Sequence, residues 1–130
     1  MDAYAGDSYE VKAKPKTTYL EPQLPPLTKS PFTGKTNAEI FKENVHAVFE
    51  ELEELLLSKH HDYGPKNIAD APGGAHNGLR VRLYDKLARR SHWVETKSVF
   101  KHETEEESYK DIANYGVIGL LVSRGLWPNE

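Results

Sequence analysis

Apolar positions recur at intervals of three and four residues in three stretches of the chain, and this spacing predicts three amphipathic helices. We expect them to span Asn37–His60, Leu79–Trp93 and Glu105–Arg124. The first begins beside Thr36 and Glu39, which stand at the spacing of a capping box. Its apolar positions are Phe41, Val45, Val48, Leu52, Leu55 and Leu56.

Proline divides the first part of the chain into pieces that are too short for a periodic element. Residues 1–36 contain five of the eight prolines and show no apolar period of either helix or strand. We interpret them as an extended arm. The predicted fold class is therefore all-α: a helical domain of three main helices over residues 37–130, preceded by an extended, Pro-rich N-terminal arm over residues 1–36.

The third predicted helix is apolar on nearly every side from Ile112 to Leu126, and it contains Gly116 and Gly119. A helix of this kind is usually buried on several sides, and small residues permit another helix to approach closely. Because one small domain offers it few partners, we expect a homo-oligomer, most simply a dimer. The alternative is a monomer whose own N-terminal arm covers the same surface.

Composition excludes several classes of protein. Cysteine is absent from the 130 residues, which excludes a disulfide framework and a thiolate zinc site. The 17 Lys and Arg residues face 20 Asp and Glu residues, for a net charge of -3, so strong direct binding to nucleic acid is not expected. No long apolar run predicts a membrane span, and the first residues do not resemble a secretory signal. We expect a cytoplasmic protein.

Donor and acceptor groups are dense in the segment that follows the first predicted helix. Asp62, Tyr63 and Asn67 lie before the turn at Pro72–Gly74. Loops held by a rigid scaffold commonly carry binding residues, so these three are candidates for contacting a ligand. The adjacent histidines at positions 60 and 61 have a simpler explanation as favourable charges at the C-terminal end of a helix.

One face of the second predicted helix carries four charged residues, namely Arg82, Asp85, Lys86 and Arg89. Their spacing of three and four residues places them on the same side of a helix. A solvated face held together by ion pairs explains this pattern. A cationic stripe that binds phosphate oxygens, with Asp85 orienting its neighbours, is the alternative, although the spacing alone favours the solvated face.

Acidic residues form a third group. Glu107 and Asp111 stand four apart, and Glu53 belongs to an acidic cluster on the first predicted helix. Carboxylates from facing helices can hold magnesium, although an exposed acidic face also accounts for the glutamate cluster. Asp111 borders an almost wholly apolar stretch, where a carboxylate needs a partner.

Three segments in this order resemble the bacteriophage family called nucleotide modification associated domain, type one: Lys59–Gly64, Gly78–Arg89 and Glu107–Tyr115. The resemblance implies a small α-helical protein of phage nucleotide metabolism, acting in the cytoplasm of the host cell. By matching position it implies ligand contacts from Asp62 and Tyr63, from the four charged residues of the stripe, and from Glu107, Asp111 and Tyr115.

The layout is also similar to that of the all-α nucleoside triphosphate pyrophosphohydrolases, which place a Glu-x-x-Glu helix and a Glu-x-x-Asp helix around magnesium. Glu50 and Glu53 match the first pair, whereas Glu107 to Asp111 is one residue longer than the second. In the enzyme hypothesis, the chain hydrolyses or modifies a nucleoside phosphate with Mg²⁺. Glu53, Glu107 and Asp111 would hold the metal, with Glu107 and Asp111 as catalytic residues. The alternative is a non-catalytic protein that captures a nucleotide or a nucleotide signal.

Overall fold

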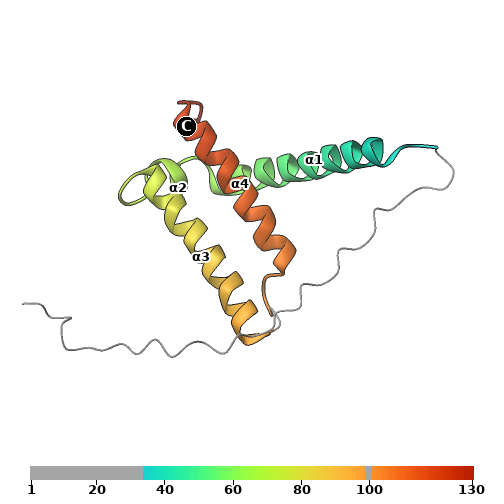
Figure 1. Cartoon of the computed structure of the whole chain (residues 1–130). Helices are drawn as coiled ribbons and strands as arrows, with labels where there is room; N and C mark the ends of the chain where they lie inside the picture. The colour runs from blue at the N-terminus through green and yellow to red at the C-terminus, as the bar shows by residue number, and fades with distance from the viewer. Residues whose placement is uncertain (1–33, 99–100) are drawn as a thin grey trace, which may run out of the picture.

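The computed structural model describes residues 34–98 and 101–130, and every regular element in these ranges is a helix. The helices are α1 (Asn37–Tyr63), α2 (Lys66–Ala69), α3 (Ala75–Thr96) and α4 (Glu105–Ser123). Helices α3 and α4 lie side by side, while α1 crosses α4 and projects well beyond it (Figure 1). The all-α class is confirmed. The predicted arm lies outside the described residues except for positions 34–36.

Two capping boxes fix the starts of α1 and α4. The hydroxyl of Thr36 accepts from the backbone N–H of Glu39 at 3.2 Å, and the Glu39 carboxylate accepts from the backbone N–H of Thr36 at 2.8 Å. Thr104 and Glu107 make the equivalent pair of bonds at 3.1 and 2.7 Å. Each box satisfies two N–H groups that a helix start otherwise leaves unpaired, so both helices begin where the sequence predicts.

The other helix boundaries differ modestly from the prediction. Helix α1 continues three residues beyond His60 and ends at Tyr63. The next residue, Gly64, has a φ of 68°, and this conformation turns the chain away from the helix. Helix α3 extends beyond the predicted range at both ends. The single turn of α2 follows Pro65 and was not predicted, because four residues are too few to show a period.

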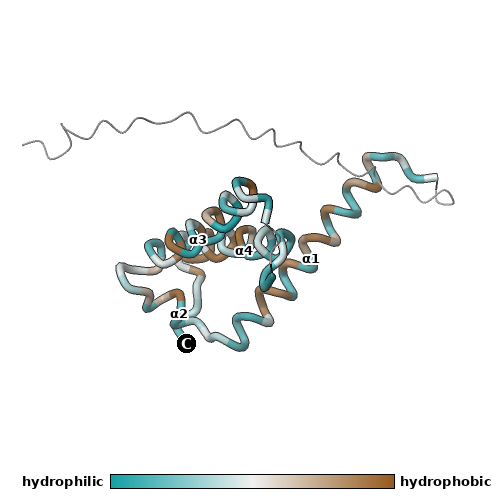
Figure 2. The backbone as a smooth tube through the Cα atoms, turned by 90° about the horizontal axis from the view of Figure 1, so that it is seen from below, coloured by the Kyte–Doolittle hydropathy of each residue, from teal (hydrophilic) through white to brown (hydrophobic). Residues whose placement is uncertain are grey.

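Few apolar side chains are buried in the described part of the chain. The buried apolar residues are Ile40, Ile68 and Leu79, and the buried polar ones are Lys86, Ser108 and Asn114. Large apolar side chains remain exposed on all three long helices, and Figure 2 shows apolar residues recurring along the projecting part of α1 as well as along α3 and α4. None of the described helices combines the length and the apolar character needed to cross a membrane. Polar contacts between helices therefore carry an unusually large part of the packing.

Glycine permits a close approach in α3 rather than in α4. A Cβ atom added to Gly78 would lie 2.5 Å from the Cβ of Ala71, so the chain after α2 contacts the backbone of α3 at this point. A Cβ added to Gly116 would meet nothing within 4 Å, and one added to Gly119 would be 3.9 Å from Leu79 Cδ1. The contact with another helix that was expected at Gly116 and Gly119 stays a prediction, and so does the homo-oligomer.

These two environments predict opposite effects of one added methyl group. Gly78→Ala should lower the free energy of unfolding by about 1–3 kcal/mol, because the new methyl overlaps Ala71. Gly116→Ala should raise it by about 0.5–1 kcal/mol, because alanine favours the helix and space is available. Urea unfolding followed by circular dichroism measures both, and equal effects of the two substitutions would contradict the packing described.

Candidate functional site

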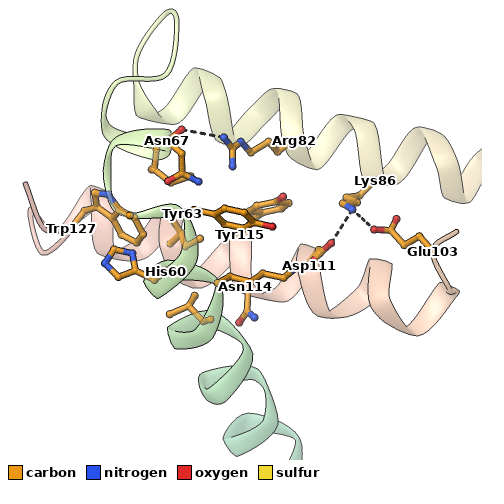
Figure 3. A pocket seen from close by; sticks show the side chains of 15 residues that line it. His60, Tyr63, Asn67, Arg82, Lys86, Glu103, Asp111, Asn114, Tyr115 and Trp127 are labelled. Atoms are coloured by element: carbon orange, nitrogen blue, oxygen red, sulfur yellow. Dashed lines mark hydrogen bonds and ion pairs between the residues drawn. The ribbon is translucent and has the colours of Figure 1, made fainter. Parts of the chain in front are cut away.

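A cavity of about 330 Å³ lies between the C-terminal end of α1 and helices α2, α3 and α4. Its charged end is formed by Lys86, Glu103 and Asp111, and its aromatic end by His60 and Trp127 (Figure 3). The walls between these ends include Tyr63, Asn67, Arg82 and Tyr115. The volume is within the range of small-molecule sites, and donors, acceptors and aromatic rings converge on it.

The carboxylate of Asp111 joins three helices at the charged end. One oxygen accepts a hydrogen bond from Lys59 Nζ of α1 at 2.6 Å, and the other lies 2.8 Å from Lys86 Nζ of α3. The side chains of Asp111 and Lys86 are only 12% and 11% exposed. Asp111 therefore has the partners that its position beside an apolar stretch requires.

Glu103 extends this network just before α4 begins. Its carboxylate pairs with Lys86, and it also accepts from Arg89 at 2.9 Å and from the Ser108 hydroxyl at 3.0 Å. The Lys86 ammonium thus lies between two carboxylates. We call Lys59, Lys86, Arg89, Glu103 and Asp111 the ion network.

The ion network holds its members in their charged forms. Burial favours neutral Asp111, but the hydrogen bonds from Lys59 and Lys86 outweigh burial and lower the pKa of Asp111 below its ordinary value of 3.8. Burial likewise opposes the charge of Glu103, and its three donors lower the pKa of Glu103 below 4.5. For Lys86, burial is again overcome, here by Asp111 and Glu103, and the pKa of Lys86 rises above 10.5.

The aromatic end depends on how the chain leaves α4. Gly125 adopts φ 65°, and the next N–H, that of Leu126, donates to the carbonyl oxygen of Leu121 at 2.8 Å, as in a Schellman motif. This turn brings Trp127 back to the cavity, where its indole N–H donates to the Pro65 carbonyl at 3.0 Å. The Trp127 ring meets the His60 ring edge to face, with centroids 5.1 Å apart.

Two polar contacts position the walls. Arg82 of α3 donates to the backbone carbonyl of Asn67 at 3.0 Å and so holds α2 against α3. Asn114 of α4 is buried, and its amide donates to the Leu52 carbonyl of α1 at 3.2 Å. Both contacts lie beside the cavity, so its shape follows from the same bonds that connect the helices.

Six of the residues singled out from the sequence line this cavity: Tyr63, Asn67, Arg82, Lys86, Asp111 and Tyr115. The other five, Glu53, Asp62, Asp85, Arg89 and Glu107, lie outside it. Asp62 is exposed beside His61, Asp85 is exposed and pairs with Arg89, and Glu53 is exposed on α1. Arg89 is at the outer edge of the ion network, where it reaches the cavity only through Glu103.

Of the three carboxylates expected to hold Mg²⁺, Glu107 and Asp111 line one small cavity, but Glu53 does not line it. Glu107 accepts from the Thr104 N–H in the capping box of α4, and both oxygens of Asp111 face lysines. In residues 34–98 and 101–130, no three histidine or carboxylate side chains are grouped so that they could hold a metal ion. The donor set therefore does not fit the expected three-carboxylate site, and the role of Mg²⁺ stays a prediction.

Sequence reasoning missed five polar or aromatic residues of this cavity as site residues: Lys59, His60, Glu103, Asn114 and Trp127. Lys59 stands one turn before Tyr63, so the two share a helix face, and this spacing could have identified it. Glu103 begins an acidic run that also suits a helix start, which hides its contact with α3. No local pattern marks Trp127, whose position depends on the turn after α4.

Comparisons with models of protein families, with curated proteins and with solved structures gave no match for this chain.

The lowered carboxylate pKa values predict how the free energy of unfolding changes at acidic pH. Asp111 and Glu103 titrate lower in the folded state than when unfolded, so their stabilisation is complete above the unfolded values and is lost as the pH falls through the folded ones. The free energy of unfolding should therefore decrease below about pH 4.5. Asp111→Asn should flatten this decrease, whereas Glu54→Gln, at an exposed carboxylate, should not. Urea unfolding between pH 3 and pH 7 tests it, and an unchanged slope in Asp111→Asn would contradict it.

Proposed function

We propose that this chain binds a nucleoside phosphate in the cavity beside the ion network. The proposal rests on one observation, that Arg82 has no carboxylate partner among the described residues. The other lysine and arginine side chains that line the cavity each pair with a carboxylate there. A guanidinium has five N–H donors, and the hydrogen bond to the Asn67 carbonyl uses one, so donors remain for phosphate oxygens.

Charge favours an anion in this cavity although the whole chain is acidic. The cations that line it are Lys59, Arg82 and Lys86, and the carboxylates are Glu103 and Asp111. Three positive charges against two leave the lining positive, whereas the chain carries a net charge of -3. Because the cavity is partly shielded from water, this local excess acts on a bound anion more strongly than the distant surface charges do.

Aromatic side chains supply a surface for the base. Tyr63 lines the cavity yet is 65% exposed, so a planar ligand can reach its ring. Tyr115 lines the same cavity from α4, and the rings of Tyr63 and Tyr115 both lie between Arg82 and Asn114 in Figure 3. Base stacking on such rings is favourable for any base. The amide of Asn67 offers donors and an acceptor to a base edge.

Binding without a chemical step fits the described residues better than hydrolysis. Hydrolysis or modification with Mg²⁺, which the family resemblance implies, needs oxygen ligands with free lone pairs turned to the ligand. Here Asp111 and Glu103 each accept from cationic side chains, and Glu107 caps α4. That resemblance is also the basis for proposing a role in phage nucleotide metabolism and a location in the host cytoplasm, whereas a homo-oligomeric state is proposed because α4 is apolar on nearly every side.

Mass spectrometry of small molecules that co-purify with the chain tests the proposal directly. A nucleoside phosphate released on denaturation is expected, and a co-purified ligand without phosphate would contradict the assignment of Arg82. Incubation of the identified ligand with the protein and Mg²⁺ then separates the two hypotheses. An intact ligand supports the binding protein, whereas a released product supports the enzyme.

Arg82→Ala should weaken binding of a phosphorylated ligand by about 1.5–3 kcal/mol, the scale of a lost charge-assisted hydrogen bond. Arg80→Ala is the matched control, because Arg80 is exposed on α3 and does not line this cavity. Isothermal titration with the nucleotide and with the corresponding nucleoside gives the comparison. Equal losses for nucleotide and nucleoside, or equal effects of the two substitutions, would count against a phosphate contact.

A further inference from the structure

Residues 41–50 of α1 face no other helix in the described part of the chain. The N-terminal half of α1 projects away from α3 and α4 (Figure 1), and all the residues from position 41 to position 51 are exposed. A helix that stands alone in water gains little from its own hydrogen bonds, and most helices in proteins are stabilised by packing of an apolar face. This half of α1 has such a face, and the described residues leave it uncovered.

The apolar face follows a heptad pattern. Phe41, Val45, Val48, Leu52 and Leu55 are separated alternately by four and three residues. This is the spacing of the a and d positions at which two helices pair. Near Leu52 the face already meets α4 of the same chain, where the Asn114 amide bonds to the Leu52 carbonyl and Lys110 pairs with Glu51. The exposed part is therefore the continuation of a packing face that is in use farther along the helix.

The exposed apolar surface of this part of α1 is large enough to form an interface. Phe41 is 60% exposed, Val45 37%, Val48 53% and Phe49 64%. Together these side chains leave on the order of 400 Å² of apolar surface in water per copy, which is the size of a functional patch rather than of scattered surface residues. Two such faces with their flanking polar side chains would bury about 1,000–1,200 Å², which is close to the lower limit for specific interfaces.

We propose that two copies of this chain pair through residues 41–52 of α1, in antiparallel orientation about a two-fold axis. The place of α4 selects this orientation. In each copy α4 already covers α1 near Leu52. Parallel pairing would bring the two α4 helices together at the same end of the pair, whereas antiparallel pairing places them at opposite ends.

The heptad pattern also fixes the register. In an antiparallel pair, a positions face d positions, so Val45 would face the Val48 position of the other copy and Phe41 the Leu52 position. Overlap over these residues ends where α4 begins to cover α1, so the two helical bodies lie at opposite ends of the pair. The cavity of the proposed function is outside this contact, and the two proposals stand independently.

The mass of the full chain in solution at high micromolar concentration tests the pairing. Light scattering after size exclusion should give twice the chain mass of 14.7 kDa. Val48→Glu should reduce it to that of one chain, because it places a carboxylate in the centre of the contact. Ala47→Glu adds the same charge on the opposite side of α1 and should leave the dimer intact. Circular dichroism should show the same helical content for both variants.

A monomer at this concentration would overturn the proposal, and would instead be the result expected if residues 1–33 of the same chain cover the face. A dimer that survives Val48→Glu would overturn it too, because the contact would then lie elsewhere. Orientation is tested separately in this chain without cysteine. On mild oxidation, a mixture of Val45→Cys and Val48→Cys chains should form mainly the mixed disulfide. Mainly like-with-like disulfides would contradict the antiparallel register.

Discussion

The carboxylate of Asp111 lies between two lysine ammonium groups, and the relative positions of the three long helices depend on this contact. Lys59 brings α1 to α4, and Lys86 brings α3 to α4, at 2.6 and 2.8 Å. Few apolar side chains are buried in the described residues, so the ion network has no large core to support it. Removing the Asp111 carboxylate leaves Lys86, whose side chain is nearly buried, with Glu103 as its carboxylate partner, and it also breaks the contact of Lys59 with α4.

The same contacts shape the cavity. The ion network forms its charged end, the bond between Arg82 and the Asn67 carbonyl connects two of its walls, and Trp127 closes the other end through Pro65. Mutual neutralisation within the network leaves Arg82 as the cation that is available to a ligand. Fold and proposed function therefore draw on one set of interactions, and a substitution in the network is expected to affect both.

Local patterns were sufficient for the helices and for part of the site. The capping box at Thr36 predicted where α1 begins, apolar periods predicted the three long helices, and helical spacing placed Arg82 and Lys86 on one face. Spacing along one helix does not reveal which residue faces it from another helix, so Lys59 and Glu103 were missed as partners. Glu107 shows a second difficulty, because one residue can fit two different patterns. Its spacing to Asp111 suits a metal site, whereas its spacing to Thr104 suits a capping box, and the structure shows the capping box.

A double-mutant cycle between Asp111 and Lys86 tests the central claim most directly. Asp111→Asn, Lys86→Gln and the double variant are compared with the unchanged chain by urea unfolding at neutral pH. If the contact connects α3 to α4 as described, the two substitutions should be coupled by about 1–3 kcal/mol, with the double variant less destabilised than the sum of the single ones. Effects that add to within about 0.5 kcal/mol would show that the two residues act independently and would contradict the account.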